Sequence, residues 1–309
     1  MQARQALDAK ASTIMFFLCI FWGLQQIVVK LAAADIAPIM QMALRSGLSA
    51  LMVFPLIKLA AGQSLFSRQY WFSGSLVAVL FAAEFCLVGE ALRFTSASHT
   101  VVLLYTAPIF VALGLHWKLP AERLTLKQWG GIFIAFLGIV VTFAGRGSSP
   151  QDLSSIVLGD VLALGAGILW ATTTIAVRLT NLSEAPATQT LFYQLVGGFV
   201  LLFPMAFVLG QGHIQWTAVT FASLVFHAVL ISFASYLIWF WLLKRYLASR
   251  LGVFSFLTPL FGILFGVLIL NEPLERNFVI GTVMVMAGVL VVSLSGRLAK
   301  KVTTQDKLA

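Results

Sequence analysis

The stretch WGLQQIVVK at residues 22–30 has a counterpart later in the chain, WATTTIAVR at residues 170–178. Each stretch starts with tryptophan and carries a basic residue eight positions later, Lys30 in the first and Arg178 in the second. The two tryptophans, Trp22 and Trp170, are 148 positions apart in a chain of 309 residues. A pattern that recurs after about half the chain predicts two copies of one structural unit.

Further landmarks recur in the same order, at offsets of 148 to 151 positions. They are Pro38 with Pro186, Phe54-Pro55 with Phe203-Pro204, Ala97-Ser98 with Ala248-Ser249, Pro108 with Pro259, Gly131 with Gly281, and Gly138 with Gly288. The stretch GRGSSPQD at 145–152 is rich in loop-forming residues and predicts the connection between the copies. We therefore expect a first repeat over residues 1–146 and a second over residues 153–309.

The composition is that of a membrane protein. Hydrophobic residues make up 60% of the chain and charged residues only 10%, and the mean hydropathy is +0.97. A soluble domain carries about 25% charged residues. Stretches of roughly 20 apolar residues, the length that spans a bilayer as a helix, occur ten times. They lie at about 14–31, 39–59, 71–92, 97–117, 127–144, 156–177, 187–209, 218–243, 251–270 and 278–296.

These spans predict an all-α polytopic membrane protein of ten transmembrane helices, five in each repeat. Because five is odd, the second repeat must enter the membrane in the opposite orientation. Inverted repeats around a site near the membrane midplane are the architecture of many secondary transporters.

The basic residues alternate between the two sides of this topology. Of 20 Lys and Arg residues, 15 fall at the chain ends and the even-numbered connections, four fall on the other side, and Arg45 lies inside a span. By the positive-inside rule both termini are expected in the cytoplasm. The net charge of +9 therefore reflects contact with the lipid bilayer, and no nucleic-acid partner is expected. Near one end of the third span, Glu90 and Arg93 are spaced to pair along the helix.

Arg45 and Glu84 are charged residues inside the predicted spans. At 1.5 Å per residue, Arg45 in span two and Glu84 in span three lie about 9 and 12 Å from the same membrane face. Tyr105 in span four lies at a similar depth. Charges are expensive in a bilayer, and they form either a buried ion pair that fixes helix packing or a binding site. In the second reading they bind the carboxylate and the ammonium of a zwitterion.

The repeat favours the binding reading, because the charges are not duplicated. Arg45 corresponds to Tyr193 or Gln194, and Glu84 corresponds to Ser235. A purely structural pair has less reason to differ between matched halves. The substrate site is therefore expected to be displaced toward the first repeat.

Aromatic residues inside the spans are further candidates for substrate binding. Trp22 is followed by Gln25, and Trp170 by three threonines; Tyr193 and Tyr236 lie in later spans. Aromatic rings beside amides and hydroxyls suit a cavity for a large organic solute. Core packing is the alternative for each of these residues.

Four prolines fall within the spans as two matched pairs, Pro55 with Pro204 and Pro108 with Pro259. Proline removes a hydrogen bond within a helix and bends it. Matched bends in both repeats suit gating, and static kinks are the alternative.

Glycines also recur on matched helix faces. Gly131 and Gly138 are two turns apart in span five, as are Gly281 and Gly288 in span ten. Small residues let helix backbones approach closely in lipid, which predicts close helix packing at both positions. A monomer is expected, and a dimer formed through these glycine faces is the alternative.

Enzyme chemistry finds little support in the chain. It lacks His-Glu-x-x-His, Gly-x-Ser-x-Gly and a phosphate-binding Gly-Lys-Ser/Thr motif. An intramembrane enzyme would need several reactive groups at one depth, and only Glu84 is available. Cys19 and Cys86 lie in spans and predict neither a disulfide nor a metal cluster. No catalytic residue, metal or cofactor is therefore expected.

A longer pattern resembles a known family. It runs from ALRFTSAS at 91–98 through Pro108 and LPAERL at 119–124 into the glycine-bearing span five. A second version runs from Leu242 through Ala248-Ser249, Pro259 and NEPL at 271–274 to Gly288. This resembles the repeat unit of the drug/metabolite transporter superfamily, EamA family. Glu84-Phe85-Cys86-Leu87 and Trp170 are most similar to the YddG-type exporters of aromatic amino acids.

The resemblance implies a secondary transporter of the bacterial inner membrane. It would export amino acids, aromatic ones above all, and related metabolites by alternating access through a central cavity. Export of lipophilic or cationic drugs is the alternative within transporters. An intramembrane enzyme and a channel are the alternatives from other classes.

Overall fold

The structure is a computed structural model that describes residues 8–59, 68–118, 123–143, 150–246, 255 and 257–305. These residues form helices and short connections, and no strand occurs among them beyond an isolated bridge between Ile36 and Ile214.

The helices of the first repeat cover the first five predicted spans. They are α1 (Ala9–Leu31), α2 (Pro38–Leu59), the short η1 (Arg68–Tyr70) with α3 (Trp71–Phe94), α4 (Ala97–Leu104) with α5 (Ala107–Lys118), and α6 (Leu126–Phe143). The fourth span is thus broken between α4 and α5, at Tyr105 and Thr106.

The second repeat follows the same plan. It comprises α7 (Pro150–Leu179), η3 (Asn181–Ser183), α8 (Ala187–Val208), the continuous α9 (Ala218–Val225), η4 (Phe226–Ser235) and α10 (Tyr236–Arg245), then α12 (Leu257–Leu270) and α13 (Arg276–Gln305). The element η4 is a π-helix. Residues 150–152, which the sequence places in the connecting loop, lie at the start of α7. Residues 144–149 and Ala248-Ser249 lie outside the described residues.

Helix lengths agree with the ten predicted spans. Within the described ranges, seven helical segments are long and apolar enough to cross a membrane. The shorter apolar helices Leu126–Thr142, Leu257–Leu270 and Arg276–Val291 supply the remaining three. The chain is therefore an all-α membrane protein of ten helices in two inverted repeats.

Contacts between the repeats follow the inverted arrangement. The main pairs that cross the boundary are α6 with α13, α2 with α8, α3 with α7, α4 with α7, and α1 with α12. Spans five and ten, and spans two and seven, occupy equivalent places and pack on each other. In the same way, α4 of the first repeat packs on α7, and the corresponding helix of the second repeat, α12, packs on α1.

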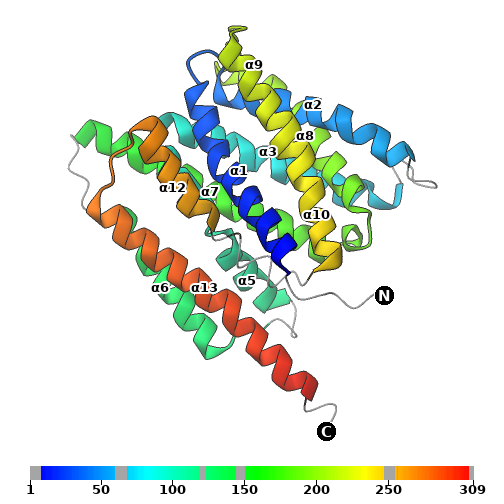
Figure 1. Ribbon diagram of the computed structural model, residues 1–309, viewed down its shortest axis with the longest axis vertical. Helices are drawn as coiled ribbons and strands as arrows, with labels where there is room; N and C mark the ends of the chain where they lie inside the picture. The colour runs from blue at the N-terminus through cyan, green and yellow to red at the C-terminus, as the bar shows by residue number, and fades with distance from the viewer. Residues whose placement is uncertain are drawn as a thin grey trace.

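Glycine faces bring α6 and α13 together, as the sequence predicts. The two helices run side by side along one edge of the molecule (Figure 1). A side-chain carbon added at Gly131 would lie 2.9 Å from the backbone oxygen of Gly288, and one added at Gly138 would lie 2.8 Å from that of Gly281. The two backbones are therefore in direct contact, which maximises van der Waals attraction between them.

Replacing Gly131 with valine is expected to loosen this contact and lower the thermal stability of the protein. Overpacking of a tight interface costs about 1–3 kcal/mol. The matched control is Gly130→Val, because no heavy atom lies within 4 Å of a carbon added at Gly130. Thermal unfolding of both variants in detergent measures the difference; equal melting temperatures would contradict the close contact.

Candidate functional site

Arg45 is a buried cation without a hydrogen-bond partner. Its side chain extends from α2 and the residue is 1% exposed. None of its three guanidinium nitrogens has a hydrogen-bond partner among the described residues. The central carbon of the guanidinium lies over the ring of Phe85 on α3, 4.2 Å from the ring centroid. A buried charge in this condition is costly, because its lost hydration is not replaced by donated hydrogen bonds.

Glu84 is the second buried charge of the region. It lies on α3 and is 6% exposed. It interacts electrostatically with Arg45, yet in the part of the chain that the structure describes no salt bridge joins the two side chains. The geometry thus lacks the buried ion pair that the purely structural reading requires.

Two tyrosines belong to the same electrostatic group. Tyr236, the first residue of α10, interacts with both Arg45 and Glu84. Tyr105, at the break between α4 and α5, interacts with Glu84 and Tyr236. The ring of Tyr105 also meets that of Trp170 edge-on, with centroids 5.2 Å apart. The first and second repeats therefore both contribute to the region around the two charges.

Trp22 and Gln25 connect α1 to the π-helix. The indole nitrogen of Trp22 donates a hydrogen bond to the hydroxyl of Ser235 at 2.9 Å. The backbone oxygen of Gln25 lies 3.1 Å from Nε2 of His227. Ser235 immediately precedes Tyr236, so both contacts place α1 beside the group around Arg45.

His227 is a member of this group that sequence reasoning missed. It is 1% exposed, interacts electrostatically with Arg45, and places Nδ1 2.8 Å from the backbone oxygen of Ser223. A single histidine with no neighbour at metal-ligand spacing gives no functional signal in the sequence. The π-helix that sets its orientation has no sequence signature, and such segments often mark functional sites.

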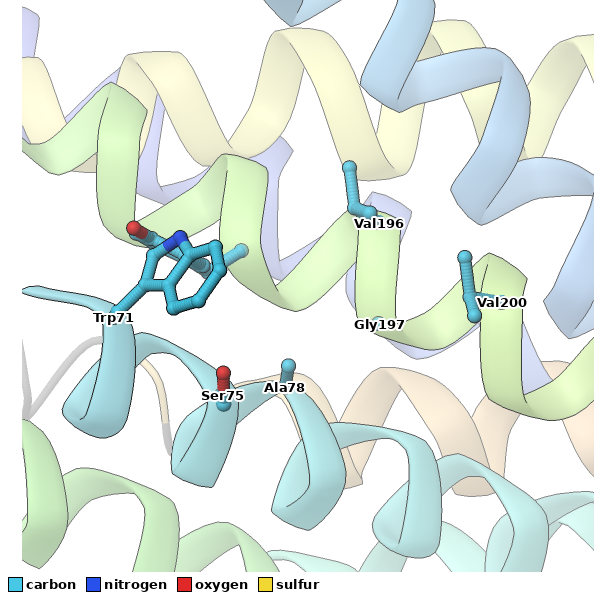
Figure 2. Close-up of a pocket in the computed structure, with 7 residues that line it drawn as sticks. Trp71, Ser75, Ala78, Val196, Gly197 and Val200 are labelled. Atoms are coloured by element: carbon cyan, nitrogen blue, oxygen red, sulfur yellow. The ribbon is translucent and has the colours of Figure 1, made fainter. Parts of the chain in front are cut away.

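Tyr193 lies apart from the other candidates. It packs with Val77 and Leu182 between α3 and α8. It also lines a cavity of about 330 Å³ that opens beside Trp71 and Gly197 (Figure 2). The offset that matched Tyr193 with Arg45 relates positions in the two repeats, and it does not imply that their side chains meet.

The prolines divide into two kinds. Pro55 lies inside α2 and Pro204 inside α8, where they can bend the helix as predicted. Pro108 and Pro259 instead lie in the first turns of α5 and α12. A first-turn nitrogen has no acceptor within its own helix, so this second pair removes no hydrogen bond inside α5 or α12. The kink interpretation of Pro108 and Pro259 stays a prediction, and span four is interrupted just before Pro108.

Polar contacts between the repeats concentrate at the end of the bundle where α1 finishes, which we call the Lys30 end. The carboxylate of Glu272 accepts hydrogen bonds from the backbone nitrogens of Ala97 and Ser98, at 2.6 and 3.0 Å, and from the Ser98 hydroxyl at 2.6 Å. Nζ of Lys30 lies 3.9 Å from the same carboxylate. Glu272 thereby caps the start of α4 from the other repeat.

The local backbone explains how Glu272 reaches α4. Asn271 ends α12 with a positive φ of 53°, a conformation that asparagine tolerates after a helix. The nitrogen of Glu272 then donates to the backbone oxygen of Gly266 at 3.1 Å. The absence of a side chain at Gly266 leaves room for this arrangement, because an added carbon would lie 2.5 Å from the Glu272 carboxylate, which would then have to shift.

Further contacts join the repeats at the Lys30 end. The buried carboxylate of Asp160 on α7 accepts from the hydroxyl of Thr95 at 2.5 Å and lies 3.2 Å from Nδ1 of His99. The Thr217 hydroxyl donates to Asp35 at 2.6 Å, and the side chain of Gln211 donates to Glu90. Glu90 also forms the predicted pair with Arg93, at 2.8 Å.

At the opposite end, where α1 begins, the described contacts between the repeats include a hydrogen bond from Tyr246 to the Asp8 carboxylate at 2.9 Å and one from Asn181 to the backbone of Gln69. Asp8 also accepts from the nitrogen of Ala11, and these bonds lower the pKa of Asp8. We call this the Asp8 end.

Comparison with known protein families finds one whose model matches this chain. The model described as the EamA-like transporter family matches residues 9–144 and again residues 157–294. The two matches coincide with the two repeats seen in the sequence and in the helix packing.

Curated relatives align over nearly their whole length. A protein of Archaeoglobus fulgidus named an uncharacterized transporter is 26% identical over 289 residues, covering 92% of this chain and 97% of that protein. Proteins of Salmonella typhimurium and Escherichia coli, each named a probable amino-acid metabolite efflux pump, are also 26% identical, covering 92% of this chain and 95% of theirs.

A solved crystal structure has the same fold. It superposes with a TM-score of 0.63 over 94% of this chain and 99% of that chain, at 20% sequence identity. At this identity the similarity supports the fold alone.

Truncation of Glu272 to alanine is expected to destabilise the protein by about 2 kcal/mol, because two backbone donors and a hydroxyl lose a charged acceptor. The drop in melting temperature of the purified variant measures this. Glu184→Ala is the control, because Glu184 is exposed. A Glu272 variant as stable as this control would show that the cap contributes nothing.

Proposed function

The chain belongs to the EamA-like transporter family, and from this premise we propose that it exports amino acids, aromatic ones above all. Family membership makes the protein a membrane transporter and not an enzyme. The substrate, the binding residues and the transport cycle are the parts that we propose. We assign binding to Trp22, Gln25, Arg45, Glu84, Tyr105, Trp170 and Tyr236, and leave out Tyr193.

The observation that carries the proposal is the unpaired guanidinium of Arg45. A buried charge whose donors have no partner is costly, and a ligand that accepts hydrogen bonds from it lowers that cost. Guanidinium matches a carboxylate with two parallel hydrogen bonds. A substrate carboxylate is therefore the natural partner of Arg45.

Glu84 supplies the complementary charge. It is buried near Arg45 without forming a salt bridge to it, so each charge remains available to a ligand. An amino acid carries an ammonium and a carboxylate on one carbon and can satisfy both. The relatives named as amino-acid metabolite efflux pumps agree with this substrate class.

Aromatic rings favour an aromatic side chain on the substrate. Trp170 and Tyr105 form an edge-on pair next to Glu84, and Trp22 forms another with Trp239, with centroids 5.6 Å apart. Rings prefer offset or edge-on neighbours, which a substrate ring can supply. We propose that these pairs line the part of the cavity that receives it.

We base alternating access on the polar contacts that join the repeats at the Lys30 end. From the charge distribution we propose that both termini, and with them the Asp8 end, lie in the cytoplasm of a bacterial cell. We propose that the structure is closed toward the outside and that the site opens to each side in turn. One chain supplies all the proposed residues, so a monomer suffices.

Charge-specific substitutions test the site. In liposomes that contain the purified protein, Arg45→Gln is expected to abolish flux of labelled L-phenylalanine while leaving some flux of 2-phenylethylamine, which has no carboxylate. Glu84→Gln is expected to abolish flux of both. Each removes one charged contact, and loss of such a contact costs about 1.5–3 kcal/mol, or roughly 10- to 150-fold.

The alternative substrate, a lipophilic or cationic drug, gives a different pattern. Such a compound would need Glu84 but not Arg45. Wild-type flux of tetraphenylphosphonium without flux of phenylalanine would remove the amino-acid proposal, and absence of any flux would remove transport of these classes altogether. Folding of each variant is checked by its elution and melting temperature in detergent.

Cross-linking tests alternating access. Asp35 and Thr217 touch across the loops that follow α1 and α8, which belong to different repeats. In the double variant Asp35→Cys and Thr217→Cys, oxidation is expected to stop phenylalanine flux, and a reducing agent to restore it. The wild-type chain, with only Cys19 and Cys86, is the control. Undiminished flux in a fully cross-linked sample would contradict opening at the Lys30 end.

A further inference from the structure

Phe85 occupies the position where a counter-ion for Arg45 would be expected. Its ring lies 4.2 Å from the guanidinium carbon, while the carboxylate of its chain neighbour Glu84 forms no salt bridge with Arg45. Consecutive residues of a helix point about 100° apart, so α3 presents a ring and a carboxylate in different directions. Arg45 contacts the ring.

The ring is held in place by its own surroundings. Phe85 is 4% exposed and its ring centroid lies 4.6 Å from that of Phe81, one turn earlier on α3. Packing on that side restricts the rotation of Phe85. The guanidinium therefore meets a surface that does not move aside.

Contact with an aromatic ring leaves the hydrogen-bonding capacity of arginine intact. The five N–H groups of guanidinium point outward in its plane, and a ring beneath the central carbon binds the cation through its π-electrons without accepting any of them. This agrees with the three nitrogens of Arg45 that have no partner in the described structure. A carboxylate that approaches from the edge would find all of its donors free.

Without the ring, the two buried charges would attract each other strongly, because opposite charges interact far more in a low-dielectric interior than in water. A direct Arg45–Glu84 bond would use the groups that the proposed substrate needs. A ligand would then have to break a buried ion pair before it could bind.

We propose that Phe85 is a positioning residue that prevents this collapse and keeps Arg45 and Glu84 separately available to a zwitterion. This inference rests on the proposed function, since it concerns the same site. It assigns to Phe85 a role that depends on both charges and not on the shape of the cavity alone.

The test uses binding of 3-phenylpropionate, a carboxylate without ammonium, and 2-phenylethylamine, an ammonium without carboxylate, measured calorimetrically on purified protein. Phe85→Leu is expected to weaken both by about tenfold, which corresponds to about 1.4 kcal/mol. Phe192→Leu is the matched control, because Phe192 is a phenylalanine of similar burial on α8 and is not the ring over Arg45. It is expected to change both affinities less than twofold.

Second substitutions separate collapse of the charges from a simple packing defect. In the Phe85→Leu background, Glu84→Gln frees Arg45 and should restore 3-phenylpropionate binding to the level of Glu84→Gln alone. Arg45→Gln should likewise restore 2-phenylethylamine binding to the level of Arg45→Gln alone. If leucine only left a packing cavity, that cavity would persist in both double variants, and their affinity for the probes would stay low.

The outcomes distinguish this inference from the function on which it rests. If the wild-type protein binds neither probe and does not bind L-phenylalanine, the proposed function fails and the role of Phe85 fails with it. If the wild-type protein binds them but Phe85→Leu behaves as Phe192→Leu does, or the double variants are not restored, only the role of Phe85 is overturned.

Discussion

A lipid bilayer offers no water to polar groups, and this constraint accounts for most of the structure. Backbone groups must bond within their own segment, which is why the described chain is almost entirely helical. Helices gain little from burying apolar surface in lipid, so they associate through close backbone contact, as α6 and α13 do at their glycines. The same constraint makes Arg45 the most informative residue in the protein. Burial of its charge at 1% exposure is costly, and this is why we propose that it binds substrate.

The fold was largely readable from the sequence because its signals are long and local. Ten apolar stretches, matched glycines such as Gly131 and Gly288, and the Glu90–Arg93 spacing each depend on residues close together or in one helix. Breaks within spans were not readable. The π-helix around His227 and the interruption at Tyr105 depend on contacts with other helices, and apolar composition does not register them.

The candidate site was readable in its charges but not in its contacts. Arg45 and Glu84 stood out because charged residues are rare in spans, whereas one phenylalanine among 26 does not, and so Phe85 was not singled out. Tyr193 shows a different limit of reasoning from a repeat. A repeat relates positions by symmetry, and symmetric positions in an inverted pair lie in different places. The capping role of Glu272 escaped notice for a third reason, since its partners Ala97 and Ser98 are more than 170 residues away.

The contacts at the Lys30 end limit the rate of the proposed transport cycle. If the repeats part there once in each cycle, the bonds of Glu272, Asp160 and Asp35 must all be broken before the next event can occur. Hydrogen bonds to charged groups contribute about 1.5–3 kcal/mol each, so together they can dominate the activation barrier for opening. Such a protein would turn over slowly at low temperature and faster when these bonds are weakened, at the expense of thermal stability. The turnover rate and the thermal stability would then depend on the same few carboxylates.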